Sequence, residues 1–517
     1  MTVRPPILLQ ILLQVAVFGA ACAAARSSGR GCSGAKKMLS ETQRFLDGLA
    51  ERGLLGATVA VNYKSCGFVY EEAFGYSVPE LKVRMTPDVA TPVGSNTKFF
   101  TAVALWQLHE RGLVDIDAPV VKYMDPKDFG QKEQWCPRLH GAPAGGACVY
   151  PTARQLLNMG SGLVDVDNCA YEPNAWQRKY CISDSQTVNL IGNNPNVAMY
   201  GAPGPAAYFA AEGYWSMPLE SAPGTAYRYV NANFQLAAYI IEKVSGLPYT
   251  QYLRIHIIEP AGLKATHVDM AYGADGALRR FFPGPAAGYR PVIAPVSEDY
   301  VQNVSVATTL DGQRLTRAKP GTVADLARQP AILGFLAWAG GAGAIYATPR
   351  DLIDFWHTVL FHPRKLNLTR ATVREMLHAT NNASAIGGIP TSTVAFAQGI
   401  IVKPNRKYKP YGVSAVLYSG GINEITSPFM LTWLDPDSGR QQDTAAVGSI
   451  FFAEPWLQVP YNSSTCVADN PWARTSSKKS FKLDKELCAV LGGGMRNYAS
   501  NKLFDIWGLG SPIAPPA

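Results

Sequence analysis

The stretch TPVGSNTKFFTAVALWQLHERGLV, residues 91–114, decides how this chain folds. Ser95 and Lys98 stand three residues apart in it, which places them on one face of a helix, about one turn from each other. The residues after Lys98 are apolar on most sides, so the helix is expected to be buried. A buried lysine one turn from a serine is unusual as a purely structural feature, and it makes chemical sense where the lysine gives up its proton.

The spacing of serine and lysine is by itself a loose pattern. It also occurs at Ser33 and Lys36, and at Ser476 and Lys479. Those two copies lie in a Gly/Ser-rich stretch and in a polar Lys-rich tail, and neither leads into an apolar helix. Ser95 alone could be an ordinary helix N-cap, a position that favours serine. The two interpretations are compatible, because a nucleophile at a helix N-terminus also lies at the positive end of the helix dipole.

The composition is that of a packed globular protein. Of the 517 residues, 47% are hydrophobic and 17% are charged, which excludes a disordered chain. The length allows one large domain or two fused domains. The formal charge of +8 comes from scattered basic residues, without the basic and aromatic stripe that nucleic-acid binding needs. We therefore expect no nucleic-acid partner.

The N-terminus is typical of a secretory signal peptide over residues 1–25. Arg4 supplies the positive start, residues 7–21 are apolar apart from two glutamines, and ACAAA at 21–25 offers a cleavage site. The sequence therefore predicts a secreted, extracellular protein with no stable membrane span after cleavage. The alternative is a protein anchored in the membrane by an uncleaved signal, for which the apolar stretch is short. A polar linker is expected over residues 26–40.

Cysteine usage agrees with an oxidising compartment. Nine cysteines are present, and all but Cys22 lie beyond the signal, which leaves an even number. Local bridges are plausible, although other pairings stay open, for the pairs Cys136 with Cys148, Cys169 with Cys181, and Cys466 with Cys488.

Four N-x-S/T sequons would be surface glycosylation sites in a eukaryotic host. They start at Asn303, Asn367, Asn382 and Asn462. No cluster of cysteine or histidine has the spacing of a metal site, so we expect neither a metal nor a cofactor.

Apolar periodicity predicts strands at both ends of the chain. Residues 56–78 alternate between apolar and polar around a turn, as a β-hairpin does. The stretches 411–420, 428–439 and 445–452 have the character of strands in an antiparallel sheet. Helical patterns precede and separate them, as in residues 45–53. We therefore predict an α+β fold, with an antiparallel sheet formed by both chain ends and flanked by helices.

The middle of the chain, about residues 110–330, is expected to be a mostly helical insertion. Its clearest helix runs over 233–246 and ends at Gly246 as a C-cap. Residues 131–215 are irregular and carry four of the cysteines, so we interpret them as long loops bordering a binding site. Residues 341–360 read as a turn, a short strand and a helix, and 461–517 as a C-terminal extension.

A second chemical element, Tyr229-Val230-Asn231, stands just before the helix at 233–246. Among 24 tyrosines, only Tyr229 is followed two residues later by asparagine. The segment could simply be a loop in which Asn231 caps the helix. A serine hydroxyl, however, needs a base to act as a nucleophile at neutral pH. A desolvated lysine or a phenolate near a cation can serve, since burial lowers the pKa of a lysine and a nearby positive charge lowers that of a tyrosine.

These residues resemble a known family: the class C serine β-lactamases, the related DD-peptidases (penicillin-binding proteins) and the β-lactamase-like esterases. The resemblance covers most of residues 42–450. It rests on four segments in the right order, at 93–126, 152–163, 223–266 and 340–356. It implies a β-lactamase/transpeptidase-like hydrolase domain over residues 41–460.

The resemblance also implies roles for the first two elements. Ser95 would be the acylated nucleophile, and Lys98 and Tyr229 would form the proton-transfer pair, with either of them as the base. Asn231 would hold the lysine and the acyl side of the substrate.

The family's third element, Lys-Thr-Gly or His-x-Gly on a strand facing the serine, corresponds here to Tyr418-Ser419-Gly420-Gly421. The glycines would let the substrate lie against the strand backbone. The backbone N–H groups of Gly421 and Ser95 would form the oxyanion hole. Tyr418 departs from the pattern, because a neutral tyrosine cannot supply the positive charge of lysine or histidine. This departure argues against β-lactam and D-Ala-D-Ala substrates, which carry a carboxylate, and favours neutral esters or amides.

The expected function is therefore a secreted serine hydrolase that acts through a Ser acyl-enzyme on an ester or amide of a small molecule or peptide. It would be of the carboxylesterase or D-amino-acid peptidase type. The alternative is a catalytically weak or inactive binding protein on the same scaffold. An α/β-hydrolase is disfavoured because no Gly-x-Ser-x-Gly element occurs, and no histidine lies in a family motif that would suggest a Ser-His-Asp triad.

Overall fold

The computed structural model of the chain describes the part that carries the sheet and most of the predicted helices. The described residues are 40–46, 54–63, 68–78, 83–143, 145–166, 175–178, 180, 209, 213–268, 307–308, 314–315, 340–379, 385–386, 389–390, 395–404, 413–422, 425–432, 444–452, 461–462, 467–469 and 480–482. The predicted signal peptide and almost all of the linker lie outside them. No helix in the described ranges is long and apolar enough to cross a membrane.

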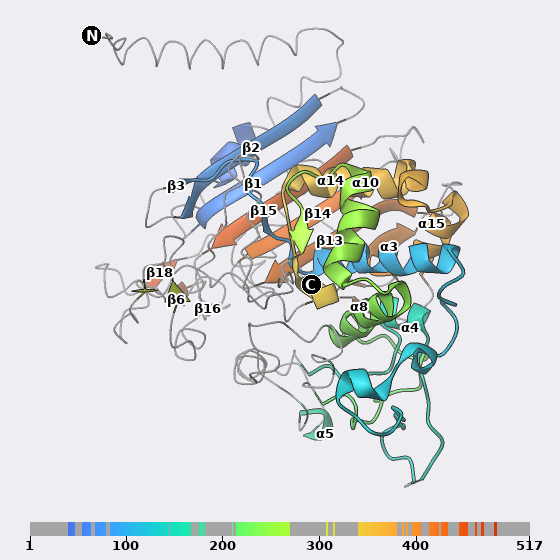
Figure 1. Ribbon diagram of the computed structural model, residues 1–517. Helices are drawn as coiled ribbons and strands as arrows, with labels where there is room; N and C mark the ends of the chain where they lie inside the picture. Colours follow the sequence, from blue (N-terminus) through green and yellow to red (C-terminus); the bar gives the residue numbers. More distant parts are fainter. Residues whose placement is uncertain are drawn as a thin grey trace, which may run out of the picture.

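An eight-stranded antiparallel sheet forms the centre of the molecule (Figure 1). The strands follow the order β11-β12-β13-β14-β15-β1-β2-β3. Their bounds are β1 Leu54–Tyr63, β2 Phe68–Val78, β3 Val83–Arg84, β11 Ala395–Phe396, β12 Ile401–Pro404, β13 Val413–Ile422, β14 Ile425–Thr432 and β15 Thr444–Phe452. β1 pairs with β15, with Thr58 opposite Ser449, so the two chain ends close one sheet. The predicted α+β fold is confirmed, as is the hairpin at 56–78. Three C-terminal strands are present as predicted, but the second covers Ile425–Thr432 where 428–439 was expected, and residues 433–439 lie outside the described chain.

Short strands surround this sheet. β4 and β5 flank β8 in a three-stranded sheet, and β16, β17 and β18 form another within the predicted C-terminal extension. The bounds are β4 Thr91–Pro92, β5 His267–Val268, β6 Ala307–Thr308, β7 Arg314–Leu315, β8 Ile345–Ala347, β9 Ala385–Ile386, β10 Ile389–Pro390, β16 Tyr461–Asn462, β17 Val467–Asp469 and β18 Ser480–Lys482.

Between β4 and β11, the described part of the chain carries helices together with the short strands β5 to β10. Figure 1 shows α4, α5 and α8 gathered on the side of the molecule away from β1 and β2. The bounds are η2 Gly94–Asn96, α3 Thr97–Glu110, η3 Val120–Tyr123, η4 Pro126–Phe129, α4 Ala153–Leu157, α5 Ala175–Arg178, α8 Ala232–Ser245, α9 Tyr249–Leu253, η6 Arg254–Ile258, α10 Glu259–Ala261, α13 Gly340–Gly343, α14 Pro349–Phe361, η9 Pro363–Leu366 and α15 Arg370–Met376. A further helix covers residues 40–46 at the start of the described chain; the rest of the helix expected over 45–53 lies outside the described residues.

The α3 helix is buried from Thr97 to Leu108, as its sequence predicts. It packs against α8 on one side. On another side, Phe99 stacks on Trp356 of α14 at 4.2 Å between ring centroids, and Phe100 stacks on Phe355. Each such apolar side chain contributes about 1.5–3 kcal/mol on burial. This packing fixes the start of α3, and with it the position of Ser95 and Lys98.

The C-cap predicted for α8 is confirmed, whereas the N-cap of α3 lies at another residue than predicted. The α8 helix ends at Gly246, whose left-handed φ of 71° is the predicted C-cap conformation. The interpretation of Ser95 as an N-cap is wrong: the N-cap of α3 is Asn96, and Ser95 lies one residue earlier in the 3₁₀ turn η2. The chain enters α3 through this tight turn, which moves the cap position one residue along.

The irregular segment after η4 contains a disulfide between Cys136 and Cys148, with their Cα atoms 4.9 Å apart. This pair is one of the three local bridges that the sequence suggests. All other cysteines lie outside the described residues. Of the sequons, Asn367 is exposed at the turn between η9 and α15, and Asn462 lies in β16, while Asn303 and Asn382 fall outside the described ranges.

Candidate active site

Ser95 lies in a turn that is fixed from behind by backbone and side-chain hydrogen bonds. The N–H of Val93 donates to the carbonyl of Ile345 in β8 at 2.9 Å. The N–H of Ile345 donates in turn to Oγ1 of Thr97 at 3.1 Å. Ser95 is half-buried, whereas Asn96 and Thr97 beside it are buried. The turn therefore presents the serine hydroxyl from a rigid support.

Lys98 is completely buried, and each hydrogen of its ammonium group can be matched to an acceptor. Nζ lies 3.0 Å from Oγ of Ser95, 2.8 Å from Oδ1 of Asn231 and 2.9 Å from the carbonyl oxygen of Ala342. Within the described part of the chain, no carboxylate forms an ion pair with it. The lysine is thus stabilised by neutral acceptors alone, one of which is the serine hydroxyl.

Tyr229 reaches the same serine from another direction. Its hydroxyl donates to Oγ of Ser95 at 2.7 Å. Nζ of Lys98 lies 5.0 Å from the centroid of its ring. The structure therefore brings Lys98 and Tyr229 to the oxygen atom of Ser95, although 134 residues separate Ser95 from Tyr229. Asn231 joins the site through its hydrogen bond with Lys98.

The side chain of Asn231 forms a hydrogen bond with Lys98 and does not cap its own helix. Asn231 is the N-cap residue of α8 by position, but its backbone is helical and its side chain makes no capping hydrogen bond. The interpretation of Asn231 as a simple side-chain cap is therefore wrong. Its amide oxygen instead accepts a hydrogen bond from the lysine.

The segment that carries Tyr229 is held by Met159, a residue that the sequence does not single out. Met159 is buried and has a left-handed φ of 62°, which is uncommon for a residue with a side chain. Its carbonyl oxygen accepts from the N–H of Arg228 at 2.9 Å, and its Sδ lies 3.4 Å from the N–H of Val230. The strained backbone conformation of Met159 thus positions Arg228 and Val230, the residues on both sides of Tyr229.

A backbone carbonyl also reaches the site, from α13. A Cβ added at Gly341 would overlap the carbonyl oxygen of Phe234 in α8, so α13 can approach only because its residues are small. This approach directs the carbonyl of Ala342 at Lys98. The sequence signal that could have indicated this contact is the small-residue run Gly340–Gly343.

The β13 strand carries the remaining predicted site residues and packs against η2. A Cβ at Gly420 would overlap the carbonyl oxygen of Val93 and lie 2.9 Å from Nδ2 of Asn96. Gly420 is therefore needed for the strand to approach the Ser95 turn, a packing role that the sequence did not predict. The expectation that this glycine lets the substrate lie against the strand stays a prediction. Ser419 and Gly421 stand on the same strand, opposite Pro428 and Thr426 of β14. The oxyanion role of Gly421 stays a prediction.

Tyr418 is buried in the site, with 4% of its surface exposed. Its hydroxyl donates to the hydroxyl oxygen of Tyr229 at 3.3 Å. Its ring meets that of Phe396 edge to face, with centroids 6.2 Å apart. Burial, together with the neighbouring Tyr229, raises the pKa of Tyr418 well above its ordinary value, so this residue stays neutral.

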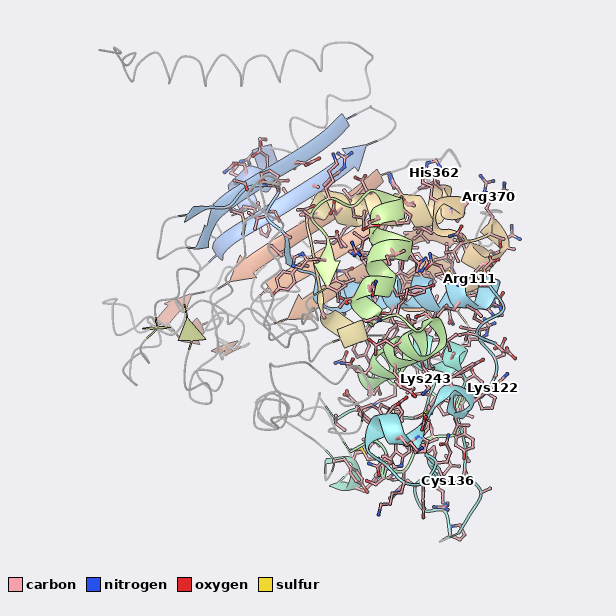
Figure 2. The ribbon with its side chains drawn as sticks, viewed as in Figure 1. Arg111, Lys122, Cys136, Lys243, His362 and Arg370 are labelled. Atoms are coloured by element: carbon pink, nitrogen blue, oxygen red, sulfur yellow. A yellow bond between two sulfur atoms is a disulfide. The ribbon has the colours of Figure 1, made fainter. Side chains whose placement is uncertain are left out.

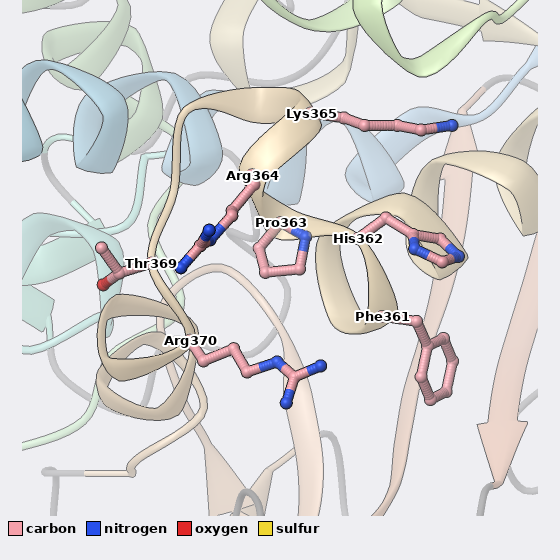
Figure 3. Close-up of a pocket in the computed structure, with 7 residues that line it drawn as sticks. All are labelled: Phe361, His362, Pro363, Arg364, Lys365, Thr369 and Arg370. Carbon is pink, nitrogen blue, oxygen red and sulfur yellow. The ribbon is translucent and has the colours of Figure 1, made fainter.

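A separate cavity of about 510 Å³ lies at the C-terminal end of α14 (Figure 3). Its walls are formed by Phe361, His362, Pro363, Arg364, Lys365, Thr369 and Arg370. The N–H of Thr369, which lines this cavity, donates to Glu110 at the C-terminal end of α3 at 2.8 Å, whereas Ser95 precedes the other end of that helix. Figure 2 labels His362 and Arg370 on the same side of the molecule as Arg111, which follows Glu110. Fourteen helical residues correspond to roughly 20 Å, so this basic cavity is distinct from the Ser95 site. In the described ranges, no group of histidine, cysteine and carboxylate residues could hold a metal ion.

Comparison with known proteins places this geometry in a family context. The family model described as Beta-lactamase matches residues 42–439. The putative penicillin-binding protein PbpX of Bacillus subtilis is 24% identical over 269 residues, covering 52% of this chain and 54% of that protein. The chain spans about half the length of the curated relatives it matches.

Two solved structures show the same fold. The octameric penicillin-binding protein homologue from Pyrococcus abyssi superposes with a TM-score of 0.53 at 19% identity, covering 80% of this chain and 74% of that one. The D-stereospecific amidohydrolase from Streptomyces sp. gives a TM-score of 0.50 at 23% identity, with 80% and 94% covered. At these identities, the two superpositions establish the fold only.

Proposed function

Because this chain belongs to the Beta-lactamase family, we propose that it is a secreted serine hydrolase that works through an acyl-enzyme on Ser95. The observation that carries the proposal is the convergence on Oγ of Ser95. Tyr229 donates to that atom at 2.7 Å and Lys98 at 3.0 Å, so two groups able to exchange protons contact one hydroxyl. A serine that serves only the fold has no need of this arrangement.

The chemistry follows from these contacts. Before the attack, the Lys98–Tyr229 pair releases one proton to solvent, which leaves either a neutral Lys98 amine or a Tyr229 phenolate as the base. Oγ of Ser95 then attacks the substrate carbonyl carbon while its proton passes to that base. The bond to the leaving group then breaks, and the leaving oxygen or nitrogen takes a proton from Tyr229. Water attacks the acyl-enzyme by the same route in reverse, which releases the acid and returns the proton to Ser95. Asn231 and the carbonyl of Ala342 hold Lys98 in place throughout.

The carbonyl oxygen becomes negative during the attack and needs donors. We assign this role to the backbone N–H groups of Ser95 and Gly421, as the family resemblance implies. A donor of this kind is typically worth about 3–4 kcal/mol of transition-state stabilisation. The approach of β13 to η2, made possible by Gly420, supports this assignment because it brings the two backbones close together.

The substrate is a small molecule or peptide with an ester or amide bond, and it carries no charged group close to that bond. Lys98 is the one cation that contacts Ser95 in the described part of the chain, and its three hydrogens are already matched by acceptors. Tyr418, where the related enzymes carry lysine or histidine, is neutral and buried. A substrate carboxylate would therefore find no cationic partner among these residues. The amidohydrolase from Streptomyces sp., which has the same fold, is named for the cleavage of amide bonds, and this is consistent with an amide or ester substrate.

Tyr418 also supports a second candidate, a binding protein on the same scaffold with little or no catalysis. Labelling with a fluorophosphonate probe separates the two. The hydrolase should be labelled at Ser95 and should hydrolyse p-nitrophenyl esters, and Ser95→Ala should lose both properties. If the wild-type protein is labelled no better than Ser95→Ala, the hydrolase proposal fails and the binding protein is favoured.

Secretion follows from the N-terminal sequence, and retention through an uncleaved signal is the alternative. Expression of the full chain in a eukaryotic host tests it. We expect the protein in the medium, with a new N-terminus close to residue 26.

A further inference from the structure

Three side-chain oxygens form a continuous chain of hydrogen bonds that begins at Tyr418. The Tyr418 hydroxyl donates to the Tyr229 oxygen at 3.3 Å, and the Tyr229 hydroxyl donates to Oγ of Ser95 at 2.7 Å. Among the described residues, Tyr418 is thus linked to the serine through Tyr229. The contact joins β13 to the segment before α8, across 189 residues of sequence.

The direction of the first hydrogen bond follows from the surroundings of Tyr418. Its ring is buried against Phe396, and burial disfavours the phenolate form. The same burial raises the pKa of Tyr418 well above the ordinary range, so its hydroxyl keeps its proton. A phenol that keeps its proton donates it, and the oxygen of Tyr229 is then the acceptor.

Tyr229 is the member of this chain that must part with a proton. Whichever residue of the Lys98–Tyr229 pair first takes the proton of Ser95, the leaving group receives its proton from Tyr229. At that moment negative charge builds on the Tyr229 oxygen. A hydrogen bond donated to a charged oxygen favours the charged form, and it does so without any net charge on the donor.

We infer that Tyr418 is a positioning residue for Tyr229: its hydroxyl fixes the direction of the Tyr229 oxygen and stabilises negative charge on it. The catalytic meaning of this contact rests on the proposed hydrolase function, whereas its effect on the ionisation of Tyr229 does not. Tyr418 thereby supports the base by a hydrogen bond where a cation would support it by charge. A neutral donor leaves the site without attraction for a substrate carboxylate, so the base is supported and carboxylate substrates are still disfavoured.

The competing explanation is that Tyr418 only fills space beside Phe396. Tyr418→Phe separates the two, because it keeps the ring and its edge-to-face packing and removes only the hydroxyl. The matched control is Tyr227→Phe. Tyr227 packs on the same Phe396 ring at 5.7 Å between centroids. Burial, together with the nearby Tyr229, raises the pKa of Tyr227 well above its ordinary value, so it is a second neutral phenol in the same surroundings.

The first measurement is the pH profile of kcat/KM for p-nitrophenyl butyrate in the wild type and both variants. In Tyr418→Phe, loss of a hydrogen bond to a charged oxygen should lower kcat/KM about tenfold or more at pH 7. It should also move the acidic limb of the profile upward by about one pH unit, since tenfold in an equilibrium corresponds to one unit. Tyr227→Phe should leave the limb in place. Tyr418→His, which restores a donor, should return the limb toward its wild-type position.

The second measurement needs no activity. The pH titration of Tyr229 is followed by NMR with isotope-labelled tyrosine, and its signal is assigned as the one missing in Tyr229→Phe. Tyr229 should titrate at higher pH in Tyr418→Phe than in the wild type or in Tyr227→Phe. Equal titration in all three proteins overturns the inference, as does an equal shift in both variants. If Ser95 proves unreactive, the hydrolase proposal fails, and this titration still decides the role of Tyr418.

Discussion

The ammonium group of Lys98 and the carbonyl oxygen of Ala342 lie 2.9 Å apart, although 244 residues separate them in the sequence. One belongs to α3, the other to α13, and α8 packs against both. The contact gives the fully buried lysine an acceptor in addition to Ser95 and Asn231. It explains how a lysine can be placed beside a serine without a carboxylate that would bind it as an ion pair.

Replacing Lys98 should remove proton transfer and leave most of the fold. Lys98→Ala is expected to slow acylation of Ser95 by about 100-fold to 10,000-fold, the usual contribution of a positioned acid or base. The measurement is the rate of fluorophosphonate labelling, with thermal unfolding as a check on folding. Lys243→Ala is the control, because Lys243 pairs with Asp128 at the surface, where such a pair contributes less than about 1 kcal/mol. Near-normal labelling of Lys98→Ala would remove this lysine from the mechanism.

Gly420 should tolerate no side chain. In Gly420→Ala the new Cβ would meet the carbonyl oxygen of Val93, so either the Ser95 turn or β13 must shift. We expect a loss of about 2–3 kcal/mol in the free energy of unfolding, as for an overpacked core, together with slower labelling of Ser95. Gly130→Ala is the comparison, because its added Cβ meets open space and costs only the strain of a φ of 68°, about 1 kcal/mol. Urea unfolding gives both values, and equal losses would contradict the close approach of β13.

Glu242 should make the stability of the protein depend on pH. Burial raises its pKa from 4.5 to about 7, and its Oε1 accepts from the N–H of Tyr249 at 2.7 Å. A carboxyl whose folded pKa is raised contributes its full stability below pH 4.5 and loses it as the pH rises through about 7. The difference between the extremes is about 3 kcal/mol at most.

Glu242→Gln cannot ionise, so its unfolding temperature should not fall over this range. The wild-type unfolding temperature, measured from pH 4 to pH 9, should approach that of Glu242→Gln at low pH and drop below it above pH 7. Parallel curves for the two proteins would show that Glu242 does not carry the effect.

A cation at position 418 should change the substrate preference. Tyr418→Lys is expected to raise kcat/KM for nitrocefin, which carries a carboxylate, relative to p-nitrophenyl butyrate, which does not. A charge-assisted hydrogen bond in a partly desolvated site is worth about 1.5–3 kcal/mol, so the ratio should rise at least tenfold. Tyr418→Phe serves as the neutral control. An unchanged ratio in Tyr418→Lys would mean that position 418 does not set this preference.

The sequence predicts those parts of the site that depend on particular side chains at a fixed spacing in a short motif. Ser95 and Lys98 are recognisable from their spacing before an apolar helix, and Tyr229 from the asparagine two residues later. Ala342 is not recognisable in this way, because it contributes a carbonyl oxygen that any residue type has. The left-handed conformation of Met159 could not be predicted from the sequence either, since methionine has no preference for that conformation.

The strands of the sheet could be predicted from the alternation of apolar and polar residues along the chain. Alternation over residues 56–78 predicts a hairpin, and the pairing of β1 with β15 explains why the C-terminal strands have the same character. The two helix-cap interpretations, at Ser95 and at Asn231, are wrong. The 3₁₀ turn η2 moves the cap of α3 to Asn96, and the side chain of Asn231 accepts from Lys98 instead of capping α8. The contact of Gly420 with Val93 could not be predicted from the sequence, because it joins a strand and a turn that are far apart in the chain. The role of Gly420 toward the substrate stays a prediction.

The central claim is that Ser95 is an activated nucleophile, and mass spectrometry of the fluorophosphonate-treated protein tests it most directly. We predict a single covalent adduct on the peptide that contains Ser95 in the wild type, with no adduct on that peptide in Ser95→Ala. Both proteins should unfold at the same temperature, so that the difference reflects the hydroxyl alone. Equal labelling of the two proteins, or an unmodified Ser95 in a folded wild type, would contradict the account.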